Sequence, residues 1–418
     1  AAGDARFNAD LGLRLGGGGL AADGTVTGPQ GSRLSLAGRL PVRLPAGATA
    51  PIVDHRGPID GRLAIDADLG KLSRLLALAD QRLEGRMRGD LEAAGTLADP
   101  SLSGGIDLTD GLYENFVSGT LLSGLAARIE PREGRALTFR LNGNDGGAGQ
   151  VAADGGAAVG ADGGIDARLS LHAANATLVR RDDVTATLDA DIAYTAEGPP
   201  RLAGRIESRE IVIRLVDRLP PTVIELPVKE IGRPRYWRPE PEGEAAAAAS
   251  IALDLAVSLP RRVFVRGRGL ESEWSGDLAI TGTSNAPQVE GQVELVRGTF
   301  SFASKRFTLQ RGTVTFAGGK KIDPFINAQA EYKSSDITAY IALTGLASQP
   351  EITISSQPPL PESEVLSQVL FGKSSAKLGP VEAVQLAAAL DALARGESTG
   401  ESALGFVRTL LGLDTLTV

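Results

Sequence analysis

The stretch GTSNAPQVEGQVELVRGTFSF (residues 282–302) decides the fold class of this chain. FTLQRGTVTFAGG (307–319) and ITAYIALTGL (337–346) continue the same alternation of apolar and polar residues. A period of two places successive side chains on opposite faces of a β-sheet. Glycines and prolines separate the runs, where turns need a permissive backbone or a missing donor. The stretch therefore predicts many short strands with one apolar face.

One set of apolar residues is expected to line a single face of this sheet, and the threonines and serines between them to line the other. The opposite set is Thr299, Ser301, Thr308, Thr315, Thr338 and Tyr340. The expected apolar face consists of Val293, Leu295, Phe300, Phe302, Phe307, Leu309, Val314, Phe316, Ile326, Ile337, Ile341, Leu343, Ile352 and Ile354.

The strand pattern stops at Pro358 and Pro359, and a helical pattern follows. Pro361 suits the first helical position, two glutamates follow in the first turn, and Gly372 suits the C-terminal cap. The apolar stripe of this helix is expected to dock on the end of the sheet or on a partner, and consists of Val365, Leu366, Val369, Leu370 and Phe371. Two further amphipathic helices are expected over 381–394 and 404–411.

The first part of the chain has the same texture of short alternating runs. A short amphipathic helix is expected near 71–83, a loop or a weak, poorly ordered pair of strands over 142–164, and a proline-rich loop near 218–244. These features suggest a division into glycine-rich strands (1–249), a second set of strands (250–357) and a helical segment (358–418).

An internal repeat links the two sets of strands. Gly95 and Pro100 recur as Gly282 and Pro287, with the following apolar positions at the same offset. A shared spacing of turn residues predicts a repeated strand–turn–strand unit, and stacked units of this kind build an elongated sheet.

Composition excludes several classes of protein. The net charge of −8 argues against general nucleic-acid binding, and the absence of cysteine excludes disulfides and thiolate metal sites. No run approaches the ~18 apolar residues of a spanning helix. The chain opens AAGDARFNAD, without an initiator methionine or a signal peptide, so we expect it to be part of a longer protein.

Residues that could support catalysis are few. His55 and His172 stand alone, and the carboxylate pairs Asp66 with Asp68 and Asp189 with Asp191 suit a solvated strand face better than acid–base chemistry. The motif FGKSS (371–375) lacks the first glycine of a phosphate-binding loop. We therefore expect neither an enzyme nor a bound metal or cofactor.

Three motifs resemble the C-terminal domain of the TamB family. They are RRVFVRGRGLESEWSGDLAITGT (261–283), the GTF segment that follows, and PPLPESEVLSQVLFG (358–372). The resemblance is close over about residues 250–418, and upstream it is firmest in ATLVRRDDVTATLDADI (176–192). It places the chain among AsmA-like proteins of the Gram-negative periplasm, which an N-terminal segment anchors in the inner membrane.

The resemblance implies a mostly β fold, an elongated curled sheet or trough (a β-taco) with an apolar concave face and short C-terminal helices. It also implies a groove that carries phospholipid between the membranes, with a TamA-like Omp85 outer-membrane barrel as partner. Two alternatives remain open: a chaperone-like factor for outer-membrane protein assembly or autotransporter secretion that acts by β-augmentation, and a filled-core β-solenoid adhesin.

Overall fold

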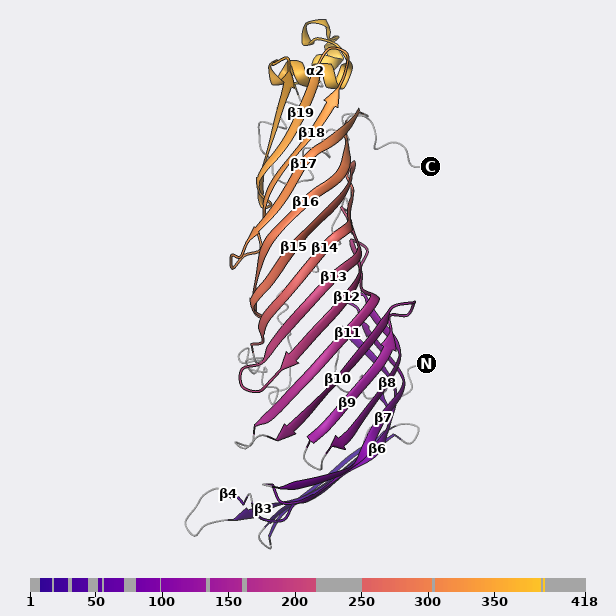
Figure 1. Ribbon diagram of the computed structural model, residues 1–418. Helices are drawn as coiled ribbons and strands as arrows, with labels where there is room; N and C mark the ends of the chain where they lie inside the picture. The colour runs from indigo at the N-terminus through magenta and orange to yellow at the C-terminus, as the bar shows by residue number, and fades with distance from the viewer. Residues whose placement is uncertain are drawn as a thin grey trace, which may run out of the picture. The chain divides into compact units, whose positions relative to one another are not determined.

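The computed structural model describes residues 8–16, 19–28, 32–43, 52–54, 56–70, 80–97, 99–132, 136–159, 164–215, 250–302, 305–384 and 386–387. Within these residues the protein is mostly β, with twenty strands and short C-terminal helices (Figure 1). The chain forms two compact units, the first from Ala1–Arg209 with Ile251–Leu255 and the second from Glu210–Ser250 with Ala256–Val418.

Unit 1 is a sheet of antiparallel strands that follow one another in sequence. Each strand pairs with the next, except that β3 pairs with both the short β4 and β5. The strands are β1 (Asn8–Gly16), β2 (Gly19–Thr27), β3 (Arg33–Arg43), β4 (Ile52–Val53), β5 (Asp60–Asp68), β6 (Gln81–Gly95), β7 (Pro100–Asn115), β8 (Thr120–Arg132), β9 (Ala136–Asn144), β10 (Gln150–Val159), β11 (Ile165–Arg180) and β12 (Val184–Thr195).

Two strands contribute residues to both units, β13 (Arg201–Arg214) and β14 (Ala252–Gly267). Within unit 1 the amide of Ala252 donates to the carbonyl of Pro200 (2.9 Å), and within unit 2 the amide of Leu215 donates to Arg266 (2.7 Å). From the first bond to the second, the residue numbers increase along both strands, so these two strands run parallel. A parallel pair needs a connection of a dozen or more residues. The chain between them supplies it, and the proline-rich loop expected near 218–244 lies outside the described residues.

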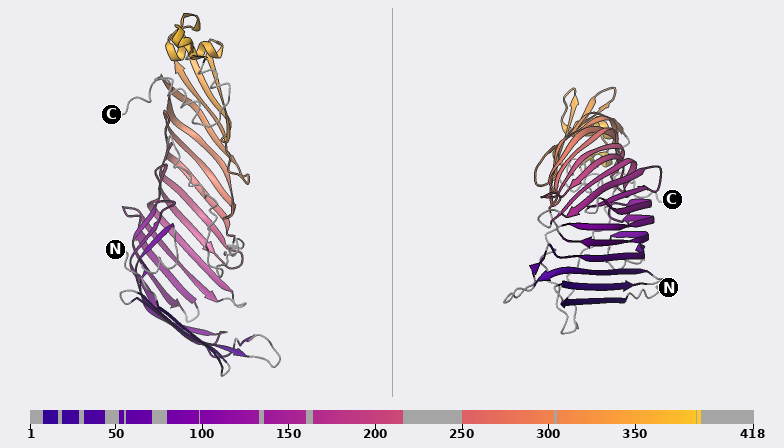
Figure 2. Two further views of the ribbon diagram at one scale, coloured as in Figure 1. Left: turned by 180° about the vertical axis from the view of Figure 1, so that it is seen from behind. Right: turned by 60° about the horizontal axis from the view of Figure 1, so that its bottom comes forward.

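Unit 2 continues as antiparallel neighbours from β15 to β20 and ends in helices. Its elements are β15 (Leu270–Thr283), β16 (Ala286–Phe302), β17 (Lys305–Ala317), β18 (Phe325–Lys333), β19 (Thr338–Leu346), β20 (Gln349–Gln357), the helix α2 (Glu362–Phe371) and the 3-10 turn η2 (Ser375–Lys377). In the described part of the chain, β20 pairs with β19 alone, so the sheet is open at this edge. The strands of each unit lie side by side in one layer (Figure 2).

The predicted strand–turn–strand unit is confirmed: in both copies the glycine and the proline lie across from each other at the turn of a β-hairpin. Gly95 lies opposite Pro100, and Gly282 lies opposite Pro287. Both glycines have positive φ, 87° and 83°, which side chains rarely tolerate. A Cβ at Gly282 would also lie 2.6 Å from the carbonyl oxygen of Ala286. Pro100 is the first residue of the returning strand β7 and Pro287 the second residue of β16, near the strand start where a missing N–H is tolerated.

The structure differs from two expectations about local structure. Gln81–Leu83 are not helical but begin β6, where Leu83 pairs with Tyr113, because the ladder overrides the helical spacing of leucines. The rest of that expected helix falls at 71–79, outside the described residues. Residues 150–159 form a regular strand instead of a weak one, since β9 and β11 flank β10 on both sides.

The predicted C-terminal helix is confirmed, with Pro361 at its N-cap and Gly372 in the left-handed conformation at its C-cap. Residues 380–384 and 386–387 are also helical, and the remainder of the helices expected over 381–394 and 404–411 lies outside the described residues. None of the described helices is long and apolar enough to cross a membrane.

Candidate functional site

The candidate site is the apolar face of the sheet in unit 2. Directly paired residues of neighbouring strands share a face, and the pairs Val293 with Val314 and Phe300 with Phe307 join β16 to β17. The pairs that extend the same face across β18, β19 and β20 are Val314 with Ile326, Leu309 with Ala330, Ala330 with Ile341, Ile341 with Ile354, Ala328 with Leu343 and Leu343 with Ile352. The register therefore places thirteen of the fourteen predicted residues on one face, and Ile337, just before β19, packs in a cluster with Phe307 and Ala339 of that face.

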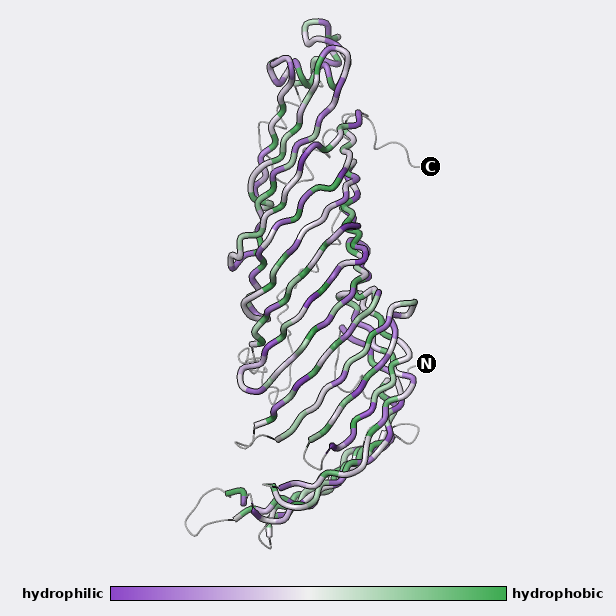
Figure 3. Tube along the Cα trace, in the orientation of Figure 1, coloured by the Kyte–Doolittle hydropathy of each residue, from purple (hydrophilic) through white to green (hydrophobic). Residues whose placement is uncertain are grey.

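The opposite face of the same strands is polar. Thr299 pairs with Thr308, Thr308 with Glu331, and Glu331 with Tyr340. Figure 3 shows the resulting alternation of hydrophobic and hydrophilic positions along the strands.

A β-bulge keeps the apolar face continuous within β16. On β15, Glu273 pairs with Arg297 while its neighbour Trp274 pairs with Leu295, so Val296 is an extra residue. Without it, Leu295 and Phe300 would lie on opposite faces, because they are five positions apart, an odd number. A second register shift, between Leu309 and Arg311, keeps Leu309 and Val314 of β17 on the same face. Bulges were not predicted from the sequence, although the switch of the apolar residues from odd to even numbers was a signal of them.

The apolar face is only partly shielded from solvent. Phe307 and Ile337 are buried (0% and 4% exposed), and Ile352 is 51% exposed. The other eleven residues of the predicted set are half-buried. A sheet face packed beneath a second layer would bury most of them, so in the described part of the chain this face is covered at one end only.

The cover at that end is α2. Val365, Leu366 and Val369 are 0–3% exposed, and Val365 and Val369 pack in one cluster with Phe307 and Ile337. Leu370 and Phe371, also predicted for docking, are half-buried. Figure 1 shows α2 at the ends of β17 to β19. The helix therefore rests on the chain's own sheet.

Four aromatic side chains gather beneath this helix. The ring centroids of Phe300 and Phe302 are 6.3 Å apart, and each lies 6.5 Å from that of Phe307. Tyr332 of β18 lies 5.4 Å from Phe307. Aromatics make up only 4% of the chain, so this concentration distinguishes the end of the face under α2 from the rest of the predicted set, in which Phe316 is the one aromatic residue.

Polar contacts of α2 brace the helical segment internally. The carboxylate of Glu364 accepts hydrogen bonds from the amide (2.9 Å) and hydroxyl (2.5 Å) of Ser375. These bonds lower the pKa of Glu364 to about 2, and the Ser375 hydroxyl makes the largest contribution. The buried hydroxyl of Ser367 donates to the carbonyl of Lys373 (2.7 Å). The segment after α2 is thus fastened to the helix.

Unit 1 also has one apolar and one charged face. Leu11, Gly24 and Leu36 follow one another at paired positions across β1, β2 and β3, and Leu11 and Leu36 are 73% and 53% exposed. On the other face Asp66, Arg88, Asp107 and Arg128 alternate in charge across β5 to β8. Arg128 Nη1 lies 2.9 Å from Asp107 Oδ1. These ion pairs are exposed, so each contributes little to stability but keeps this face in water.

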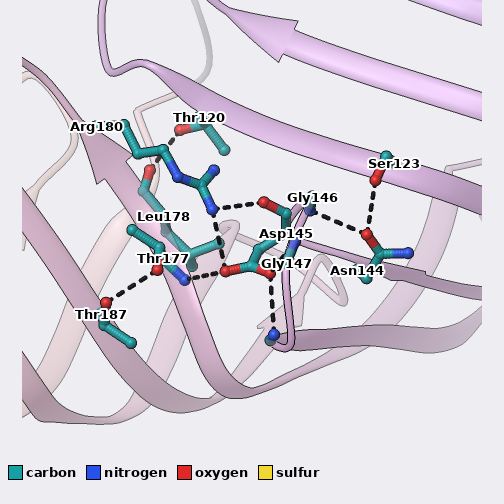
Figure 4. A network of polar contacts seen from close by, with 11 residues as sticks. Thr120, Ser123, Asn144, Asp145, Gly146, Gly147, Thr177, Leu178, Arg180 and Thr187 are labelled. Atoms are coloured by element: carbon teal, nitrogen blue, oxygen red, sulfur yellow. Dashed lines mark hydrogen bonds and ion pairs between the residues drawn. The ribbon is translucent and has the colours of Figure 1, made fainter.

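A buried polar network fastens the turn between β9 and β10 to β11 (Figure 4). Asp145 is 3% exposed, and its carboxylate accepts from the amides of Gly147, Gly149 and Thr177 (2.8–2.9 Å). Arg180 Nη2 lies 3.1 Å from the same carboxylate. Burial raises the pKa of Asp145, but the three amides and the guanidinium outweigh it and lower the pKa. Sequence reasoning missed this network because its partners lie about 30 residues apart.

The titratable groups considered for catalysis have structural partners. His172 Nδ1 lies 2.6 Å from Asp191 Oδ1 on the exposed face, and Asp66 pairs with Arg86 and Arg88. Asp189 accepts from the amide of Asn175 (2.7 Å). Lys373 of the FGKSS motif pairs with Glu382 (3.0 Å). His55 lies outside the described residues, and the described residues contain no group of three or more potential metal ligands.

Two comparisons with known proteins bear on this site. A family model described as the TamB C-terminal domain matches residues 139–418, more than half of the chain and further upstream than the motifs alone indicated. The chain is also similar to a protein of Haemophilus influenzae named "Translocation and assembly module subunit TamB", with 27% identity over 172 residues. The similar region covers 40% of this chain and 13% of that protein, so the chain spans a small part of its relative.

Proposed function

Since this chain belongs to the TamB family, we propose that its apolar sheet face shelters the acyl chains of phospholipids in the envelope of a Gram-negative bacterium. The observation that carries the proposal is one apolar face, continuous across β16 to β20 and half-buried over most of its predicted residues. A contiguous apolar patch that remains accessible to solvent commonly marks an interaction site.

The physical reason is that acyl chains need no polar site. Each methylene moved from water to an apolar surface contributes ~0.8 kcal/mol, so a long aliphatic face can hold a lipid tail. In this proposal the face is the concave side of a trough, and the threonine-rich face meets water. In this proposal the headgroup stays in solvent.

The proposed setting is the periplasm, with an inner-membrane anchor in another part of the protein. The relative's name, a translocation and assembly module subunit, supports a role in outer-membrane biogenesis beside a TamA-like Omp85 barrel. Under this proposal the chain is one part of a bridge between the two membranes, and it acts without an enzymatic step.

The test is site-specific photo-crosslinking in the intact protein. A photoreactive residue at Val314 or Leu343 should capture phospholipid, and one at the neighbouring Thr315 or Thr344 should not, because neighbours on a strand point to opposite faces. Equal capture on both faces would refute the assignment of the lipid face. Absence of lipid at all four positions, with the protein folded, would refute the proposed function.

A second candidate function is favoured by the open edge of β20. This nine-residue strand pairs with β19 only, among the described residues, and its free edge could add a strand from a client barrel protein. Ser356→Pro should disturb such pairing, because Ser356 lies opposite Ala339 at a position whose N–H points away from β19, and the change replaces no apolar side chain. Loss of barrel assembly with normal lipid capture in this variant would favour the assembly factor.

A further inference from the structure

We propose that the aromatic cluster beneath α2 is a terminal acyl-chain subsite, which α2 occupies in place of a lipid. The cluster consists of Phe300, Phe302, Phe307 and Tyr332. This inference rests on the proposed lipid-binding function and adds to it the location of a covered site and the segment that covers it.

The subsite is continuous with the accessible part of the face. Ala330 and Ile341 are paired neighbours that pack in or against the cluster, and Leu343 lies two residues further along β19 and is half-buried. No change of face separates the two regions. An acyl chain that lies along the open part would therefore meet α2, and not a polar boundary, when it advances toward the aromatic end.

The contact between α2 and the sheet is apolar. Val365 and Val369 are buried against Phe307, Ala330, Ile337 and Ala339. By contrast, the polar contacts seen for α2 in the described residues stay within 361–375, as in Gln368 with Glu364 and Ser367 with Lys373. An acyl chain can replace such a contact methylene for methylene, and no hydrogen bond to the sheet has to be broken.

The helix is also built to move as a unit. A ten-residue helix is marginal alone in water, but Glu364 and Ser367 tie α2 to the segment that follows it. These bonds stay intact when the helix lifts from the strands. Its apolar stripe would then be free for another apolar surface, while the aromatic subsite receives the lipid.

The experiment compares a locked and a released helix in the whole chain, with a photoreactive residue at Tyr332 or at Leu343. The chain has no cysteine, so a disulfide can be introduced between Val365 or Val369 and Ile337 or Ala339, four residues of one cluster. The release variant is Val369→Asp, which places a carboxylate against apolar side chains. Its matched control is Val381→Asp, at a helical residue that is 71% exposed. The probe is a vesicle of phosphatidylethanolamine and phosphatidylglycerol.

Release should increase lipid capture at Tyr332 by roughly 10-fold or more, because a covered state typically leaves ~10% or less of molecules open. Capture at Leu343 should stay unchanged. The disulfide should abolish capture at Tyr332, and reductant should restore it. Two results would overturn the subsite, provided that position 343 captures lipid. The first is equal lipid capture at position 332 in the locked and the released protein. The second is no lipid capture at position 332 after release. Absence of lipid at both positions would instead count against the proposed function.

Discussion

Asp145→Ala should open the turn between β9 and β10, and its cost can be worked from the contacts in Figure 4. The side chain of Asp145 is 4% exposed and serves three amides and Arg180. Alanine leaves the three amides without an acceptor, and since each unpaired buried donor typically costs about 1–3 kcal/mol, the total should be about 3–5 kcal/mol. Asp145→Asn keeps one carbonyl oxygen and should cost less, about 1–2 kcal/mol.

The assay is hydrogen exchange at the amides of Gly149 and Thr177, since local opening is better defined than global unfolding in a chain with two units. A local loss of 3 kcal/mol accelerates exchange by roughly 100-fold. Asp183→Ala, which removes a solvent-exposed ion pair with Arg181, is the control and should leave both amides unchanged. Exchange at Gly149 and Thr177 that is as slow in Asp145→Ala as in the parent protein would refute the reasoning.

The acid response of the same network has a definite sign. The pKa of Asp145 is lowered in the folded protein, with burial opposing the shift and the three amides and Arg180 outweighing it. Its stabilisation is therefore fully present above the unfolded pKa of ~4 and is lost as the pH falls through the lower folded value. Protection of the Thr177 amide should fall in that window in the parent protein. The Asn variant should lack the Asp145 contribution to this pH dependence.

Three further predictions concern the face, the helix and the turns. Leu343→Arg should reduce phospholipid capture at Val314 while Thr344→Arg on the opposite face does not, because a guanidinium on an apolar face is costly to pass with a lipid tail; equal effects of the two would contradict the face assignment. Glu364→Gln should loosen Ser375 from α2 near neutral pH, which faster hydrogen exchange of the Ser375 amide would show. In the parent protein, lowering the pH from 5 toward the Glu364 pKa of about 2 should have the same effect. An Asn or Gln variant of Glu364 that keeps full protection of this amide would argue against that brace. Gly291→Val should destabilise the hairpin of β15 and β16 by about 3 kcal/mol in thermal unfolding, since φ is +129° and a Cβ would lie 2.2 Å from the Asp277 carbonyl oxygen, whereas Gly16→Ala, with nothing within 4 Å, should not.

Local chemistry explains which features the sequence predicts correctly. Alternation identifies the strands of unit 2, Gly282 and Pro287 identify a hairpin, and Gly372 ends α2. Each of these rests on backbone preferences of a few consecutive residues. The fourteen residues of the apolar face were assigned to one side from the same alternation; the register places thirteen of them together, and packing places Ile337 with them.

Features that depend on distant partners were not predictable in this way. The parallel pairing of β13 with β14 depends on contacts such as Ala252 with Pro200, about 50 residues apart. The leucines before Leu83 are spaced as in a helix, yet Leu83 lies in a strand because β6 pairs with β7, where Tyr113 is its partner. Asp145 looked like one more polar residue in a glycine-rich loop, since its role depends on Thr177 and Arg180.

The arrangement of stabilising contacts bears directly on how the face could work. Strands β16 to β20 are held by ladder hydrogen bonds and by cross-strand pairs such as Val293 with Val314, neither of which requires a second layer. Where a second element is present, α2 meets the sheet through apolar side chains and keeps its polar contacts to itself. A sheet built this way can change what covers its apolar face without losing its own hydrogen bonds. That property suits a surface over which acyl chains must pass, whereas a filled core would lose stability with every change of occupant.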